Sequence, residues 1–167
     1  MPYPLAGLLR IRDFRVDAAS KAMRAAETRV RAAQAELAEK EAEWERYGVW
    51  RQEEVERRYQ SIMNRAMLLP EIDAFKAGLS ALADQELLRE EAARKAARAL
   101  EKAREEARNA REGWLLANRE RQKIDYHRDN WQQYQAKEES RREDVEQEEF
   151  KPLLFETGSD EPSYSDF

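Results

Sequence analysis

The chain has 167 residues, of which 39% are charged, with five glycines, five prolines and a formal net charge of −5 at pH 7. A sequence this polar cannot bury a wide globular core, although it can bury the narrow apolar seam of a coiled coil. Cysteine is absent and histidine occurs once, so disulfides and thiol-based metal sites are excluded. We expect neither a metal site nor a cofactor.

A long first helix is predicted over residues 5–66. Its only glycines are Gly7 and Gly48, each of which a helix tolerates at a cost of about 1 kcal/mol. Apolar residues recur every three or four positions as far as Tyr47, and the pattern then resumes in a shifted phase. Such a shift is a stutter, which locally unwinds a supercoil. Arg12 and Lys40 interrupt the apolar stripe with charges.

The segment Asn64–Phe75, NRAMLLPEIDAF, contains Pro70, the one proline in the long central part of the chain. A proline is costly inside a helix but suits its first turn. Glu71 and Asp73 would then lie at the amino end of a helix, where the helix dipole favours carboxylates. We therefore predict a bend over residues 64–71, from which a second helix begins.

The second helix is predicted over residues 71–149, because its apolar residues keep one 3.5-residue register over eight heptads. The polar exceptions to that register are Glu86, Arg89, Arg121 and Arg128.

An antiparallel pairing of the two helices places facing residues at numbers that add to a constant. With a sum near 137, Val30 faces Ala107, and large residues mostly meet small ones, as close packing requires. The predicted fold is therefore all-α, a long antiparallel two-helix coiled-coil hairpin that forms one domain over residues 1–149. The alternative is a single rod, kinked at Pro70, that dimerises.

Residues 150–167, FKPLLFETGSDEPSYSDF, are predicted to form a flexible acidic tail. Residues 136–167 hold 11 acidic and 4 basic side chains, whereas residues 1–69 hold 11 acidic and 13 basic ones. Phosphate would be repelled by the acidic block, so we do not expect nucleic-acid binding. No apolar run is long enough for a signal peptide or a membrane span, which predicts a soluble, cytoplasmic protein.

Residues with catalytic chemistry are not arranged in any recognisable motif, and a helical rod has no concave pocket in which to shift a pKa. His127 has no second histidine or cysteine to assist it, so we assign it to the surface or to a partner contact. We therefore predict that the chain is not an enzyme. Most aromatic residues can fill gaps in the seam, whereas Trp50 lies off the seam, where we expect it to be exposed and able to anchor a partner.

Three stretches carry a family resemblance: the opening YPLAGLLRIRDFRVDAA, the midsection EWERYGVWRQEE and the close HRDNWQQYQAKEESRREDVEQEEFKPL. Together they resemble the YscO (SctO) proteins of type III secretion systems and their flagellar counterpart, FliJ. The resemblance covers residues 3–153, and QEEF is its most specific motif. It implies an antiparallel coiled coil similar to the gamma subunit of rotary ATP synthases. It also implies a role as the central stalk of the secretion ATPase hexamer, in contact with the export-gate membrane protein and, in some systems, with secretion chaperones.

The resemblance further implies where partners bind this chain. The joined helix ends, residues 5–31 and 123–150, would face the ATPase ring, and residues 62–82 around the bend would face the export gate. The candidate residues are Arg10, Arg12, Arg15, Arg24, Trp131, Glu138, Glu143 and Glu146 at the first surface, and Met67, Leu68, Leu69 and Phe75 at the second. We expect a monomer, associated peripherally with the secretion apparatus at the inner membrane.

Two other functions remain open at this point. The first is an escort or chaperone-binding protein that captures coiled-coil secretion components through the apolar bend segment AMLLPEIDAF. It predicts that polar substitution of Met67, Leu68 and Leu69 abolishes capture and spares the fold. The second is a structural scaffold, which predicts a stable parallel dimer with no effect on any ATPase.

Overall fold

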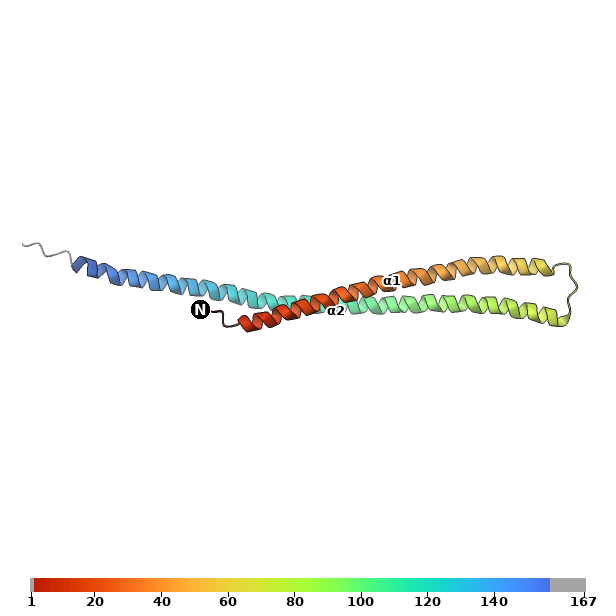
Figure 1. Cartoon of the computed structure of the whole chain (residues 1–167), viewed down its shortest axis with the longest axis horizontal. Coiled ribbons are helices and arrows are strands. Elements are labelled where there is room, and N and C mark those ends of the chain that lie inside the picture. Colours follow the sequence, from red (N-terminus) through yellow and green to blue (C-terminus); the bar gives the residue numbers. More distant parts are fainter. Residues whose placement is uncertain (1, 157–167) are drawn as a thin grey trace, which may run out of the picture. The chain divides into compact units, whose positions relative to one another are not determined.

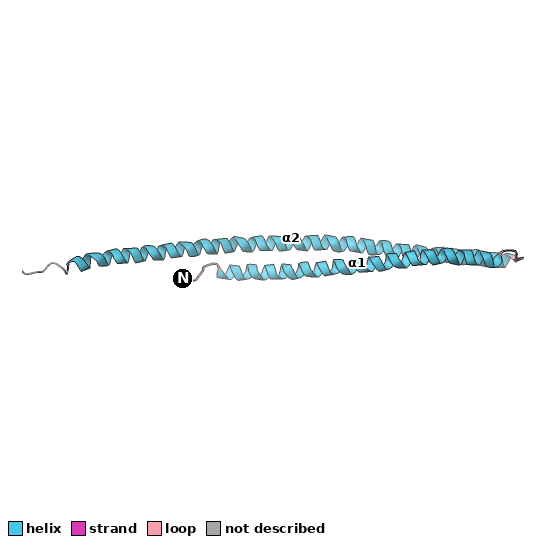
Figure 2. Ribbon diagram, turned by 90° about the horizontal axis from the view of Figure 1, so that it is seen from above, coloured by secondary structure: helices cyan, strands magenta, loops and turns pink. Residues whose placement is uncertain are grey.

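The computed structural model describes residues 2–156 and contains two helices, α1 over Ala6–Ile62 and α2 over Leu69–Glu156 (Figure 1). Over these residues Figure 2 shows helices and short connecting segments, without a strand. The chain is therefore all-α, an antiparallel two-helix coiled-coil hairpin, as predicted. It forms two compact units, which we name the bend unit (Val16–Leu116) and the terminal unit (Met1–Arg15 with Ala117–Phe167).

The helix ends differ by several residues from those expected. α1 stops at residue 62 rather than 66, and α2 begins at residue 69 rather than 71. α2 also continues beyond residue 149, so that residues 150–156, assigned to the tail, are helical. Pro152 removes one backbone donor there, but the residues around it are mostly helix formers. The rest of the predicted tail, residues 157–167, lies outside the described residues.

Backbone geometry explains why α1 ends where it does. Asn64 has a φ of 59°, the left-handed conformation that commonly terminates helices and that asparagine tolerates well. The N–H of Arg65 donates to the carbonyl of Ile62 at 3.2 Å, which satisfies one of the last free carbonyls of the helix. The asparagine, rather than the proline six residues later, therefore ends the first helix.

The amino end of α2 is capped by the side chain of Glu71, a residue of its first turn. The N–H of Leu68 donates to Oε2 of Glu71 at 2.8 Å, which is one half of a capping box. Pro70 lies in the first turn of α2, as predicted, where its missing N–H would have had no partner inside the helix. Glu71 thus acts as a capping side chain in addition to complementing the helix dipole.

A narrow seam of small side chains holds the bend unit together. The buried residues of this seam are Ala26, Leu82, Ala93, Ala96, Leu100 and Ala103. Most of them carry a single methyl group, so each buries little apolar area and the pairing depends on the summed length of the seam.

Aromatic contacts supplement the seam of the bend unit nearer to the bend. The hydroxyl of Tyr47 donates to the carbonyl of Leu82 at 3.1 Å, and the guanidinium of Arg89 lies 4.0 Å from the centre of the Tyr47 ring. Closer still to the bend, the rings of Tyr59 and Phe75 pack edge to face at 5.2 Å. Nearer to the bend than the buried alanines, bulky side chains of each helix therefore contact the other helix.

Candidate partner-binding surfaces

In the terminal unit, the first residues of the chain contact α2 through Tyr3. The Tyr3 hydroxyl lies 2.9 Å from Nδ1 of His127 and 3.4 Å from the carbonyl oxygen of Ile124. The Tyr3 ring also packs against Trp131, with the ring centres 5.6 Å apart. The structure thus gives His127 a contact within the fold that the sequence did not indicate. Trp131, predicted to bind a partner, is half-buried in the same aromatic cluster.

Ion pairs also join α1 to α2 within the terminal unit. Arg12 lies 3.6 Å from Glu120, and Nε of Arg121 donates to Asp13 at 2.5 Å. Arg121 also pairs with Asp125 at 3.0 Å. Arg12 and Arg121 are two of the charges that interrupt the predicted apolar stripes. Arg12, a predicted partner-binding residue, is therefore engaged within the fold.

Glu120 links this network to the helix surface. The ammonium group of Lys123 donates to Glu120 at 2.8 Å. That hydrogen bond, followed by the positive charges of Lys123 and Arg12, holds the pKa of Glu120 below its ordinary value. Glu120 is therefore fully ionised at neutral pH and remains an acceptor for Arg12.

The remaining predicted residues of the terminal unit are more accessible. Glu138 is half-buried and pairs with Arg141 at 3.0 Å, whereas the exposed ones are Arg10, Arg15, Glu143 and Glu146. Every side chain from residue 139 to residue 149 is exposed, including Val145 at 55%. This stretch, which we name the acidic extension, therefore presents all of its faces to solvent within the described part of the chain.

The apolar residues predicted at the bend are accessible as well. Leu68 is 71% exposed and Leu69 is 72% exposed. Met67 is half-buried, and Met63, which the sequence reasoning missed although it adjoins the bend, is 69% exposed. We name these four residues the bend surface. Clustered apolar side chains of this kind commonly mark a protein interface.

Two predicted residues do not join the surfaces to which they were assigned. Phe75 is half-buried against Tyr59, so it supports the helix pairing beneath the bend surface. Arg24 is exposed but belongs to the bend unit, whereas the residues grouped with it belong to the terminal unit. Trp50, predicted to be exposed, is 43% exposed, which confirms that it lies off the seam.

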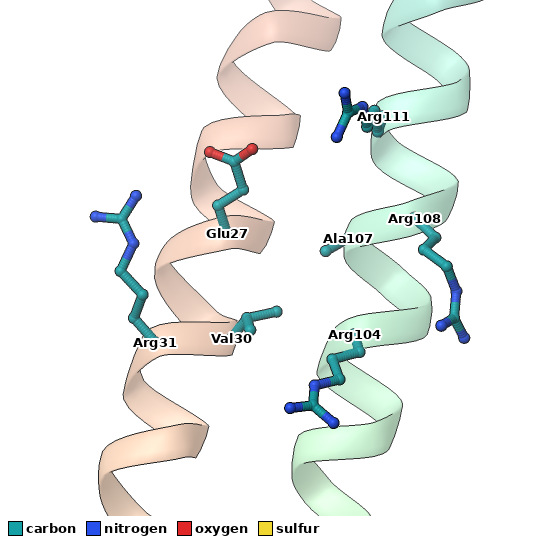
Figure 3. Close-up of a pocket in the computed structure, with 7 residues that line it drawn as sticks. All are labelled: Glu27, Val30, Arg31, Arg104, Ala107, Arg108 and Arg111. Carbon is teal, nitrogen blue, oxygen red and sulfur yellow. The ribbon is translucent and has the colours of Figure 1, made fainter.

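An open hollow of about 530 Å³ lies between α1 and α2 within the bend unit (Figure 3). We name it the arginine groove, and it is lined by Glu27, Val30, Arg31, Arg104, Ala107, Arg108 and Arg111. Val30 and Ala107 face each other across it, as the predicted helix pairing required.

Among the described residues, no cluster of three or more histidine, aspartate or glutamate side chains could hold a metal ion. The described part of both helices also lacks any window apolar enough to span a bilayer.

Comparisons with known proteins agree on one family. Residues 5–152 match the family model described as type III secretion protein YscO. The crystal structure of YscO from Vibrio parahaemolyticus is 29% identical, with a TM-score of 0.79 over 87% of this chain and 92% of that chain. The structure of a YscO homologue from Chlamydia trachomatis is 26% identical, with a TM-score of 0.76 over 94% of this chain and 96% of that chain. No curated protein sequence matches significantly.

The family match covers most of the sequence, and both similar structures align over nearly their whole length. The chain therefore belongs to the YscO family of type III secretion proteins.

Proposed function

We propose that this chain is the central stalk of a type III secretion system, binding the hexameric secretion ATPase and coupling it to the export gate. The observation that carries the proposal is the acidic extension, a helix exposed on every face in a member of the YscO family. A helix exposed all round is suited to a partner that encloses it, as a ring does.

The side chains of the acidic extension fit this role. Glu143 and Glu146 are exposed, and Val145 is the one large apolar side chain between residues 139 and 149. Exposed ion pairs contribute only about 0–1 kcal/mol each, so a charged surface binds the successive states of a ring with similar strength. A strongly apolar surface would instead hold one state and stall the cycle. Arg10 and Arg15 supply exposed positive charge in the same unit.

The bend surface is proposed to contact the export gate. Its leucines and methionines provide the apolar contact area that the acidic extension lacks. In this proposal the protein acts as a monomer on the cytoplasmic side of the inner membrane and associates peripherally with the secretion apparatus.

The stalk proposal is tested by the ATPase activity of the cognate secretion ATPase, with and without the full chain. We expect stimulation by the wild-type chain. Glu143→Arg with Glu146→Arg should abolish most of that stimulation, because both charges at the enclosed helix are reversed. The matched control is Glu36→Arg with Glu39→Arg, which has the same spacing on an exposed part of α1. A wild-type chain that neither binds nor stimulates the ATPase would exclude the stalk role.

A second candidate function is the capture of secretion chaperones by the bend surface, which the exposure of Leu68 and Leu69 favours. Leu68→Ser with Leu69→Ser should abolish chaperone capture in a pull-down and leave ATPase stimulation unchanged. If instead the substitutions reduce stimulation and spare capture, the bend surface serves the ATPase.

A further inference from the structure

The seam of the bend unit opens at the arginine groove. Ala26 and Ala103, one turn away on each helix, are buried, whereas Val30 and Ala107 are only half-buried. Figure 3 shows these two short side chains pointing toward each other with space between the helices. Neither is long enough to fill a hollow of about 530 Å³. The groove therefore has an apolar floor that the fold itself leaves uncovered.

Arginines from both helices line the groove beside this floor. Arg31 comes from α1, while Arg104, Arg108 and Arg111 come from α2; Glu27 is the one acidic residue of the lining. Figure 3 shows the guanidinium groups of Arg104 and Arg111 toward the space between the helices, whereas those of Arg31 and Arg108 point away from it. The net charge of the lining is +3, from four arginines and one glutamate.

Most of this charge is not neutralised within the described part of the chain. Arg104 pairs with Glu101 at 2.8 Å. In that same part, Arg31, Arg108 and Arg111 have no ion-pair partner. They contrast with Arg29, which pairs with Glu106 at 3.3 Å between the same two helices. Arg29, which joins the helices, is thus paired across them, whereas three of the four arginines of the groove have no ion-pair partner within the described part of the chain.

We propose that the arginine groove docks an acidic amphipathic helix of another protein. Carboxylates of that helix would pair with Arg104 and Arg111, since arginine binds carboxylates through two parallel hydrogen bonds. An aliphatic side chain between the carboxylates would cover the apolar floor. Placing a third helix along the seam of two others is the helix-in-groove mode of recognition. The groove belongs to the bend unit, so the proposal does not depend on the stalk function.

Nucleic acid fits the groove less well than an acidic helix does. A phosphate backbone gains nothing from the apolar floor, and Glu27 would repel it. The exposed face of α2 next to the lining also carries Glu101, Glu105 and Glu106. Carboxylates spaced along a helix can avoid these acids, whereas a continuous row of phosphates cannot.

A direct binding assay tests the proposal with the full chain. The probe is a fluorescein-labelled, alanine-based helical peptide that carries glutamates and one leucine on a single face. Anisotropy should show saturable binding that weakens as salt rises, because the arginines are exposed. The control peptide has the same composition in scrambled order and should bind at least about fivefold more weakly, since its leucine and glutamates no longer share a face.

Variants locate the binding site. Arg111→Glu should weaken binding of the probe roughly fivefold or more, because an attractive charge becomes repulsive. Arg98→Glu is the matched control: it reverses another exposed arginine of α2 that has no ion-pair partner among the described residues and does not line the groove. Ala107→Leu should fill the groove, block the probe and leave the thermal midpoint unchanged or higher. This opposite effect on binding and stability separates a docking site from a merely structural one.

Several results would overturn the proposal. It fails if the probe does not bind, or if Ala107→Leu and Arg111→Glu bind it as well as the wild type does. Tighter, Arg111-dependent binding of single-stranded DNA would assign the groove to nucleic acid instead. A concentration-dependent dimer in light scattering, lost in Arg111→Glu, would assign it to a second copy of the chain.

Discussion

The two helices are held together by different side chains in the bend unit and in the terminal unit. In the bend unit the helices meet through buried alanines and leucines such as Leu100, and aromatic contacts supplement them nearer to the bend. In the terminal unit they meet through Tyr3 and ion pairs such as Arg121 with Asp13, and the buried seam residues named above all lie outside it. Apolar burial is insensitive to partner charge and salt, whereas exposed ion pairs respond to both.

This difference shows how a two-helix protein can be stable in one unit and respond to a partner in the other. Among the described residues, the buried apolar side chains all belong to the bend unit, so it should dominate the free energy of unfolding. The terminal unit is joined by contacts that are individually worth about 1 kcal/mol or less. A partner that offers its own charges can therefore compete with them at modest cost, which suits the unit proposed to bind the ATPase.

The largest expected effect comes from breaking the apolar seam. Leu100 is buried in the bend unit, and Leu100→Ala should lower the free energy of unfolding by about 2–3 kcal/mol through lost burial and a residual cavity. Urea unfolding followed by circular dichroism measures the change. Leu116→Ala, at an exposed position, is the control and should change it by less than about 0.5 kcal/mol. Equal losses in the two variants would mean that the seam does not dominate.

The heptad register of the apolar residues predicted this seam, because the spacing of apolar side chains determines which faces of two helices can meet. The same periodicity placed Val30 opposite Ala107 and Trp50 off the seam. It could not show that Arg12 and Arg121 are paired with acids on the other helix, since a sequence does not give the rotation of each helix about its axis. Judged by the periodicity alone, these charges only interrupt the apolar stripes of the two helices.

The ends of the helices were harder to predict from sequence. Proline was taken as the signal for the bend, but Asn64 ends α1 through its left-handed backbone. Asparagine is one of the few residues that adopt this conformation easily, so the signal was present but weak. The contact of Tyr3 with His127 and Trp131 could not be foreseen, because it joins residues more than 120 positions apart outside any repeat.

A smaller loss of stability is expected when the aromatic contact of the terminal unit is removed. Tyr3→Ala deletes the ring packing on Trp131 and the hydroxyl contact with His127, at a combined cost of about 1–2 kcal/mol. Hydrogen exchange should show faster opening of residues 6–14 and unchanged protection in the bend unit. Tyr3→Phe, which keeps the ring, should lose about half as much. Tyr134→Ala is the matched control at an exposed tyrosine; an equal effect there would argue against a specific contact.

The two units can also be strengthened separately by replacing glycine with alanine. A Cβ added at Gly113 or Gly7 would meet no atom within 4 Å. Gly113→Ala should raise the stability of the bend unit by about 0.5–1 kcal/mol, since alanine has the higher helix propensity. Gly7→Ala, in the first turn of α1, should raise protection in the terminal unit by less. At Gly78 the added Cβ would lie 2.9 Å from the guanidinium of Arg58, so Gly78→Ala should gain less than Gly113→Ala. A similar gain in stability at Gly78 and Gly113 would contradict the expected clash of the added Cβ with Arg58.

The smallest expected effect is a pH dependence that differs between the units. The pKa of Glu120 in the terminal unit is lowered first by the hydrogen bond from Lys123, and the pKa of Glu54 in the bend unit is lowered first by the hydrogen bond from Arg58. Since each pKa is lower in the folded state, the stabilisation is present above the ordinary value of about 4.5 and is lost as the pH falls through the folded value.

Hydrogen exchange measured between pH 6 and pH 3, and corrected for intrinsic rates, can separate the two contributions. Glu120→Gln should reduce the acid-induced loss of protection in residues 6–14, and Glu54→Gln should reduce it around the bend instead. Because both carboxylates are half-buried in ion pairs at the helix surface, each change should be small next to that of Leu100→Ala. If Glu120→Gln leaves the acid response of residues 6–14 unaltered, the charge network does not stabilise the pairing of the terminal unit. Tyr3 would then be its main contact.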